Sequence, residues 1–103
     1  MIMALIETKR QAAEYLGIPE YKILTFHEFQ NGDWSYCDRN NHEHLYRFID
    51  DQWIELTENI LAMWVDSYPD GGWEYKDEKG FHHKFNKNNE LIVMKNYGIN
   101  KSQ

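Results

Sequence analysis

The chain has 103 residues, a length that predicts a single domain, residues 1–103, with one modest core. It has one cysteine, Cys37, and no apolar stretch long enough for a signal peptide or a membrane span, so we expect a cytoplasmic protein without a membrane partner. The net charge is −6, and residues 31–75 hold ten Asp or Glu against two Lys or Arg, which predicts either an acidic interaction face or an ordinary solvated surface.

The first predicted element is a short helix over residues 8–16. Thr8 and Gln11 have the spacing of a capping box, and Gly17 is suited to end the helix. The helix carries a narrow apolar stripe made by Ala12, Ala13 and Leu16. We expect this stripe to pack against residues 18–26.

Residues 19–30 are compatible with two structures. Pro19 fits the first turn of a helix, and the apolar residues Ile23, Phe26 and Phe29 recur at helical spacing. The dipeptide Asn31-Gly32, in contrast, is typical of a β-hairpin turn. In residues 58–68 a helical apolar face recurs behind a capping threonine, as Thr57 followed by Ile60, Leu61, Trp64 and Tyr68. By analogy we predict a helix in both segments.

Four residues at the start of the chain have the spacing of two crossing helices: Ala13, Gly17, Ile18 and Ile23. Through them residues 8–26 resemble the helix-turn-helix of excisionase-type and MerR-type DNA-binding proteins. The resemblance implies DNA contacts from Lys9, Arg10, Tyr21, Lys22 and Thr25. Lys22 is the only cation of the implied recognition helix, whereas duplex binding depends on several Lys or Arg. A helical hairpin that only packs is the other interpretation.

From Trp34 onward the sequence repeats itself with a constant offset of 39 residues. Trp34, Tyr36, Asp38, His44 and Tyr46 recur as Trp73, Tyr75, Asp77, His83 and Phe85. Strand-forming stretches at 33–38, 43–49 and 52–56 are matched by stretches at 73–77, 81–86 and 90–96. We therefore predict an α+β fold, in which an N-terminal helix is followed by two pseudo-repeated units. Each unit is a helix and a three-stranded antiparallel meander, at about residues 19–57 and 58–96, packed as one domain.

Five histidines suggest a metal site as one hypothesis. His42 and His44 alternate along a predicted strand and would face the same way, whereas His82 and His83 would point to opposite faces. Asp38 and Asp77 could add carboxylates. No second dense cluster of His and Cys completes a site at familiar spacing, so we predict neither a metal nor another cofactor.

The sequence also argues against an enzyme. Cys37 has His27 or His44 as conceivable bases, but it lies within a predicted strand, without a helix N-terminus or a basic neighbour to lower its pKa. The six glycines are scattered at turns and form no phosphate-binding loop. We therefore predict no catalytic residue.

The repeated Trp–Tyr pairs have two interpretations, because Trp and Tyr two residues apart on a strand share one face. They form the core, or one pair is an exposed anchor within an acidic rim. The second interpretation gives a partner-binding set of Asp33, Trp34, Tyr36, Asp38, Asp70, Trp73, Glu74 and Tyr75. It predicts a small non-enzymatic intracellular binding protein, of the inhibitor or immunity type found in phages and plasmids. Its partner would be a basic protein, such as a nucleic-acid-processing enzyme. The alternative is a helix-turn-helix transcriptional regulator or excisionase-like protein.

Overall fold

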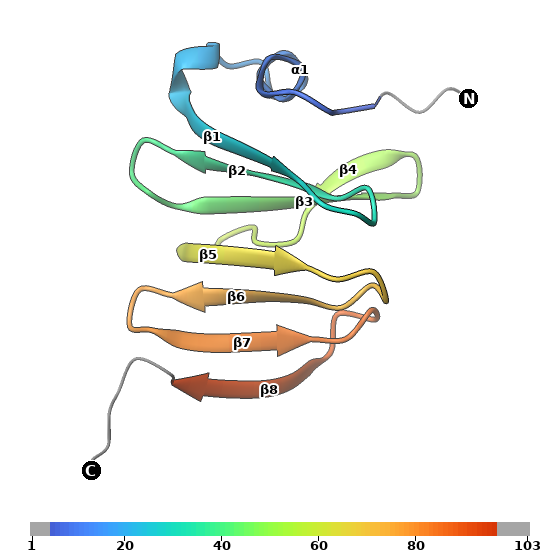
Figure 1. Ribbon diagram of the computed structural model, residues 1–103, viewed down its shortest axis with the longest axis vertical. Coiled ribbons are helices and arrows are strands. Elements are labelled where there is room, and N and C mark those ends of the chain that lie inside the picture. The colour runs from blue at the N-terminus through green and yellow to red at the C-terminus, as the bar shows by residue number, and fades with distance from the viewer. Residues whose placement is uncertain (1–4, 97–103) are drawn as a thin grey trace.

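The computed structural model describes residues 5–96, which form one α-helix, one 3₁₀ turn and eight strands. The elements are α1 (Lys9–Leu16), η1 (Glu20–Lys22), β1 (Ile23–Glu28), β2 (Trp34–Asp38), β3 (Glu43–Ile49), β4 (Gln52–Glu55), β5 (Ala62–Ser67), β6 (Trp73–Asp77), β7 (Phe81–Phe85) and β8 (Leu91–Asn96). All strand pairs are antiparallel, in the order β1-β2-β3-β5-β6-β7-β8, with β4 paired to β3 beside this path. Figure 1 shows the strands stacked along the long axis, with α1 beyond β1.

The helix predicted at residues 8–16 is confirmed, together with both of its ends. The Thr8 hydroxyl accepts a hydrogen bond from the Gln11 N–H, and the Gln11 side chain accepts one from the Thr8 N–H, both at 3.1 Å. Gly17 ends the helix at a φ of 71°, in the left-handed region that suits glycine. Ala12 and Ala13 pack with Ile23 in a buried cluster, as expected. With eight residues, the one α-helix within 5–96 falls short of the length and apolar character that crossing a membrane requires.

The helices predicted at residues 19–30 and 58–68 are wrong, and with them the fold of two helix–three-strand units. These segments contain β1 and β5, so sheet dominates the structure. The strand registers explain the misleading helical spacing. Ile23 lies opposite Asp38 and Phe26 opposite Tyr36, with a bulge between Ile23 and Thr25. The bulge places Ile23 and Phe26 on one face although they are three residues apart, which imitates a helix.

The same correction removes the second helix of the helix-turn-helix. Tyr21 and Lys22 lie in the 3₁₀ turn η1, and Thr25 lies in β1. Lys9 and Arg10 begin α1, where Arg10 forms an exposed ion pair with Glu14 at 3.7 Å. The five residues of the resemblance therefore present no recognition helix that could enter a DNA groove.

The sheet consists instead of two four-stranded units, β1–β4 (the first unit) and β5–β8 (the second unit). Their first hairpins match residue for residue at the 39-residue offset. Phe26 lies opposite Tyr36 as Val65 lies opposite Tyr75, and the bulge after Ile23 recurs after Ala62. The predicted strands at 33–38, 43–49, 52–56, 73–77, 81–86 and 90–96 are confirmed within one or two residues at their ends.

Stacked rings repeat at the same offset. Trp34 stacks on Tyr46 with ring centroids 4.4 Å apart, and Trp73 stacks on Phe85 at 4.3 Å. Beside them Tyr36 stacks on His44 at 4.6 Å, and Tyr75 on His83 at 4.4 Å. These cross-strand pairs are the packing interactions that fix the strand register in both units.

The two units join along β3, because β4 and β5 pair with different parts of the same edge of β3. The end of β3 from Tyr46 to Ile49 pairs with β4, and Glu43 at its start pairs with Ala62 of β5. Tyr46 packs in a first core with α1 and Trp34, whereas Leu45, on the other face of β3, packs in a second core with Trp73. Each side of the first unit is therefore covered by a different part of the chain.

Candidate functional site

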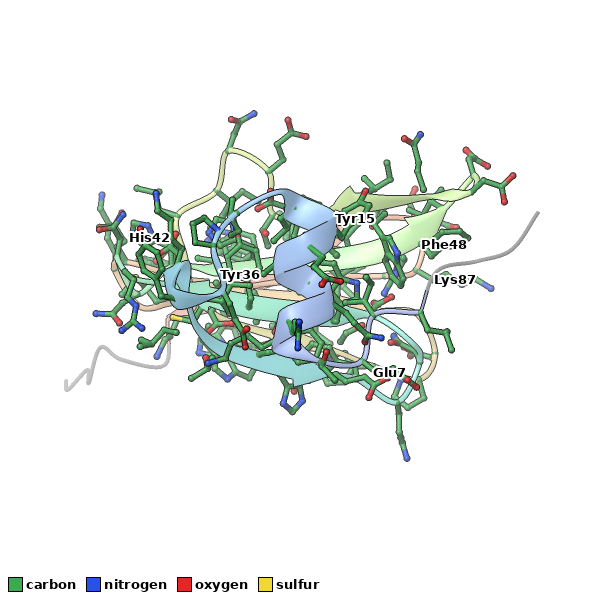
Figure 2. All side chains as sticks on the ribbon, turned by 90° about the horizontal axis from the view of Figure 1, so that it is seen from above. Glu7, Tyr15, Tyr36, His42, Phe48 and Lys87 are labelled. Carbon is green, nitrogen blue, oxygen red and sulfur yellow. The ribbon has the colours of Figure 1, made fainter. Side chains whose placement is uncertain are left out.

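A cleft of about 370 Å³ opens at the end of the first unit where the β1–β2 and β3–β4 turns lie. In Figure 2, Glu7 and Phe48 mark this end of the molecule and His42 marks the other. The lining residues are Leu5, Ile6, Glu7, Glu28, Asn31, Gly32, Asp33, Arg47, Phe48, Trp53 and Gly71. We call this site the acidic cleft. Its volume suits one side chain or a small ligand.

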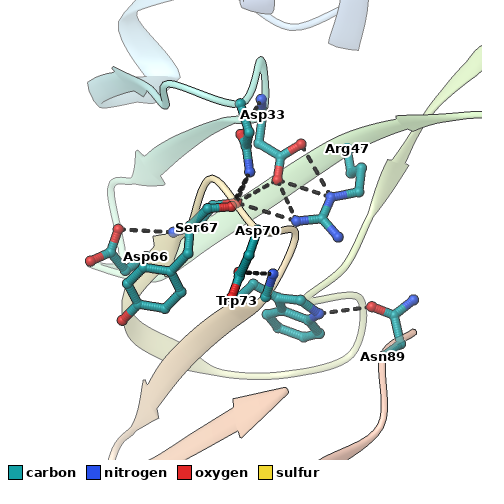
Figure 3. A network of polar contacts seen from close by, with 10 residues as sticks. Asp33, Arg47, Asp66, Ser67, Asp70, Trp73 and Asn89 are labelled. Carbon is teal, nitrogen blue, oxygen red and sulfur yellow. Dashed lines mark hydrogen bonds and ion pairs between the residues drawn. The ribbon is translucent and has the colours of Figure 1, made fainter. Parts of the chain in front are cut away.

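One wall of the acidic cleft is a buried ion pair. The Arg47 guanidinium donates to both carboxylate oxygens of Asp33, at 2.8–3.2 Å, and Ser67 Oγ donates to Asp33 Oδ2 at 2.6 Å (Figure 3). Asn31 Nδ2 donates to Ser67 Oγ at 2.7 Å and so brings the β1–β2 turn against β5. Asp33 is 3% exposed, so its charge is neutralised inside the protein.

The lining of the cleft includes two further carboxylates, Glu7 and Glu28. Glu7 precedes the helix cap, and its N–H donates to Gln11 Oε1 at 2.7 Å, which fixes its backbone. Glu28 ends β1, opposite Trp34. Both side chains are exposed, and neither forms an ion pair within residues 5–96. The charges of Asp33 and Arg47 cancel, so the cleft has a net charge of two negative charges, those of Glu7 and Glu28.

The apolar part of the lining, which we call the apolar floor, is formed by Phe48, Trp53 and Leu5. Phe48 and Trp53 meet edge to face, with centroids 5.1 Å apart, and Leu5 beside them is 56% exposed. Trp53 is 9% exposed, and its buried indole N–H has no hydrogen-bond acceptor among the described residues. A cleft lined by both apolar side chains and exposed carboxylates is suited to a group that is aliphatic or aromatic along its length and cationic at its tip.

The structure buries both predicted tryptophan anchors. Trp34 is 0% and Trp73 is 3% exposed, so both lie in the two cores, and neither is available to a partner. The interpretation of the Trp–Tyr pairs as exposed anchors is thereby corrected. The two tryptophans are buried because α1 covers the face shared by Trp34 and Tyr36, and because Leu45 of the first unit packs in one core with Trp73.

The remaining residues of the predicted set do not share one surface. Tyr36 and Tyr75 are half-buried in the ring stacks, and Asp38 accepts hydrogen bonds from the backbone of the β2–β3 turn. Glu74 accepts one from Tyr68 at 2.6 Å. Asp70 is exposed at the β5–β6 turn, where it accepts the Gly72 N–H at 2.8 Å. Of the set, only Asp33 lines the acidic cleft.

His44 lies between two carboxylates of the first unit. Its Nδ1 is 2.7 Å from Glu55 Oε2, and its Nε2 is 2.8 Å from Asp38 Oδ2. Burial lowers the pKa of His44, but the hydrogen bonds to Glu55 and Asp38 outweigh burial and hold the pKa above its ordinary value of 6.5. Burial raises the pKa of the Asp38 and Glu55 carboxyls, but the hydrogen bond that each makes to His44 lowers it. The net result is a pKa below the ordinary value for both groups. With both nitrogens engaged, His44 is not placed to act as a general base.

The other histidines are dispersed. His82 Nδ1 lies 2.7 Å from Glu74, on the opposite face of β7 from His83, whose Nε2 lies 2.9 Å from Asp77. His42 lies at the β2–β3 turn. Within residues 5–96, no three His, Cys, Asp or Glu side chains are grouped as a metal ion requires. The paired histidines and carboxylates are cross-strand contacts of the sheet.

Cys37 is a free, buried cysteine in β2. Burial and the neighbouring Glu43 raise the pKa of its thiol to about 11. A thiol with this pKa is protonated at neutral pH and is a poor nucleophile.

Sequence reasoning missed Glu7, Glu28 and the apolar floor of the cleft. A signal was present for Glu28, because a strand-end carboxylate next to a hairpin turn lies on the rim of a sheet. The approach of residues 5–7 to the β3–β4 hairpin is a long-range contact that no local pattern encodes. Comparison with known protein families, with curated proteins and with solved structures gave no significant match in any of the three.

Proposed function

We propose that the protein is a small, non-enzymatic binding protein whose acidic cleft receives a cationic side chain of a basic protein partner. The observation that carries this proposal is the pair Glu7 and Glu28, two exposed carboxylates that form no ion pair within residues 5–96 and line the acidic cleft together with Phe48 and Trp53. A Lys or Arg side chain is complementary to both parts. Its stem can lie on Phe48 and Trp53 while its charged head reaches the two carboxylates.

The charge of the whole chain supports the same kind of partner. A net charge of −6 attracts a basic surface before contact and so increases the association rate, provided that salt does not screen it. At physiological ionic strength this attraction extends about 8 Å, so it acts only when the partner is already close to the surface. The cleft would then select for a side chain that can enter it.

Two features support a role other than catalysis. The Cys37 thiol, with a pKa of about 11, is not activated. His44 has a carboxylate on each ring nitrogen and so no free position for proton transfer to a substrate. These observations concern the suggested nucleophile, Cys37, and one of its two suggested bases, His44.

Within this proposal, the protein acts as an inhibitor or immunity-type protein in the cytoplasm, and its partner is a basic protein such as a nucleic-acid-processing enzyme. The support is the small size, the net charge and the unpaired buried cysteine, which suits a reducing compartment.

The test uses isothermal titration calorimetry with an arginine-rich peptide as the probe. We expect Glu7→Gln with Glu28→Gln to weaken binding about tenfold, equivalent to the loss of two partly exposed charge contacts. The matched control is Glu58→Gln with Glu78→Gln, which removes the same charge at exposed positions that do not line the cleft. Capture of partners from a cell extract with the same two variants then identifies the natural ligand.

Equal weakening by the two double variants would show that only total charge matters, and the cleft would not be the site. A Phe48→Ala variant supplies a second readout that involves no charge. If it leaves peptide affinity unchanged, the apolar floor takes no part in binding and the proposal is wrong.

A further inference from the structure

Strand β8 forms the last edge of the sheet. One side of β8 pairs with β7, and no strand within residues 5–96 pairs with the other side. At the opposite end of the sheet α1 packs against β1 through Ala12, Ala13 and Ile23 (Figure 1). The sheet thus has a helix against its first strand and an open edge at its last.

This open edge is apolar. Leu91 is 53%, Ile92 54% and Met94 55% exposed, the largest group of exposed apolar side chains on one strand of the described chain. Exposed edge strands normally carry charges along their length, or bulges, that discourage pairing with another chain, and β8 has one bulge, at Ile92. Here the charges are restricted to the two ends of the apolar run, at Glu90 and Lys95. Because no charge interrupts the run from Leu91 to Met94, the strand is suited to pairing with a second strand that accommodates the bulge.

A bulge in β8 gives this run a symmetric pattern. Lys84 lies opposite Val93 and Phe85 opposite Leu91, so Ile92 is the extra residue. Leu91 and Met94 therefore share the face of Phe85 and His83, while Val93 and Lys95 share the other face. If Ile92 is left out because it has no partner in β7, the residues of the strand follow in the order Glu90, Leu91, Val93, Met94, Lys95, and Val93 is the central one.

We propose that β8 is a self-association edge, at which two copies of the chain pair antiparallel across a two-fold axis at Val93. Leu91 of one copy then lies opposite Met94 of the second, and Glu90 opposite Lys95 of the second, each contact occurring twice by symmetry. The pairing joins the eight-stranded sheets of two copies into one and covers the exposed apolar run.

Charge complementarity selects this arrangement over the others. A parallel pairing of two β8 strands would place Glu90 against Glu90 and Lys95 against Lys95, and like charges directly opposite are destabilising. Centring the axis on Met94 instead would place Val93 opposite Lys95 and leave Glu90 without a cation. A head-to-tail contact of β8 with β1 of another copy would be heterologous, which generates rings or open filaments and not an isologous dimer.

The test is sedimentation velocity over a range of protein concentrations at low salt. We expect a reversible monomer–dimer equilibrium, and about tenfold weaker dimerisation for Glu90→Lys and for Lys95→Glu, because each places like charges opposite at two symmetric positions. The double variant Glu90→Lys, Lys95→Glu exchanges the charges and should restore the wild-type dissociation constant within about twofold. The apolar contact is tested by Leu91→Ser, with Leu61→Ser as the control of nearly equal exposure, 53% against 54%.

Asn86 Nδ2 donates to Glu90 Oε1 at 2.8 Å, so the Glu90 variants also change the β7–β8 turn. Lys95 also has a contact within its own chain, so thermal unfolding is measured for the Glu90 and the Lys95 variants alike. Lys95→Glu, outside the β7–β8 turn, must weaken the dimer under conditions in which its fold is intact. A monomer at every concentration, open-ended growth beyond the dimer, or single charge reversals without effect would each overturn the proposal. None of these outcomes depends on the acidic cleft, which lies on the first unit.

Discussion

Ser67 Oγ donates a hydrogen bond of 2.6 Å to Asp33 Oδ2, across a separation of 34 residues in the chain (Figure 3). The bond fixes the end of β5 to the β1–β2 turn, and Arg47 closes the network from β3. The first and second units are therefore joined by a buried charged contact as well as by the shared second core.

Replacing Arg47 by Met should lower the free energy of unfolding by about 3–5 kcal/mol, because it leaves the Asp33 carboxylate buried without a counter-charge. Adding Asp33→Asn should recover part of this loss, since the uncompensated charge is then removed. Urea unfolding measures both values. The control is Arg10→Met on the exposed Arg10–Glu14 pair, for which we expect less than about 1 kcal/mol. An equal loss at the two arginines would contradict the buried role.

The contribution of His44 to stability should depend on pH in a defined window. Its pKa is raised above 6.5 on folding, so its stabilisation is present below pH 6.5 and is lost as pH rises through the folded pKa. The pKa of Glu55 is lowered from 4.5, so its stabilisation is present above pH 4.5 and is lost as pH falls through the folded pKa. The difference in unfolding free energy between wild type and His44→Gln should be largest between these limits, 4.5 and 6.5.

The pH series is compared with His27→Gln, a change at an exposed histidine of β1. A His44→Gln difference that stays constant from pH 4 to pH 9 would show that the carboxylate contacts do not contribute as charges.

Gly32 and Gly71 give a matched pair for backbone and packing effects. Both have a φ of 95°, where any L-residue is strained by about 1–2 kcal/mol. A Cβ at Gly71 would lie 2.8 Å from Lys87 Cβ, whereas one at Gly32 would meet nothing within 4 Å. We expect Gly71→Ala to destabilise more than Gly32→Ala, by about 1–3 kcal/mol of overpacking. Equal midpoints in chemical unfolding would exclude the contact with Lys87.

The Trp73 indole N–H donates to Asn89 Oδ1 at 2.8 Å, whereas the Trp34 N–H has no partner within residues 5–96. Asn89→Ala should therefore cost about 1–3 kcal/mol for the unsatisfied donor, in addition to any backbone strain. Asp50→Ala is the control, because Asp50 occupies the equivalent position 39 residues earlier, also at positive φ. Thermal unfolding of the two variants compares them directly. If they lose equal stability, the Trp73 bond contributes nothing.

The sequence predicted those elements whose signals are local. The capping box of Thr8 and Gln11 and the left-handed Gly17 are determined by residues that adjoin them in the chain. The six correctly predicted strands were recognised from their own composition and from the turn residues between them. β1 and β5 were mispredicted because a bulge near the start of each interrupts the alternation, and Ile23 and Phe26 then have helical spacing while they lie on a strand. A bulge depends on the partner strand, which the segment itself does not contain.

The candidate site was less predictable than the fold. Alternation shows that Trp34 and Tyr36 share a face, but not what covers it. Coverage is decided by α1 for Trp34 and by Leu45 for Trp73, two long-range contacts. The carboxylates that remain accessible, Glu7 and Glu28, lie outside the repeated positions and therefore did not stand out.

The two cores differ in how early a growing chain can complete them. Every buried member of the first core lies between Ile6 and Trp53, so it can form once the ribosome has released that stretch. The second core needs Phe29 and Leu45 from the first unit together with Trp73 from the second. The early-made half therefore provides a finished surface on which the later half condenses, and synthesis proceeds in the order in which the structure can be assembled.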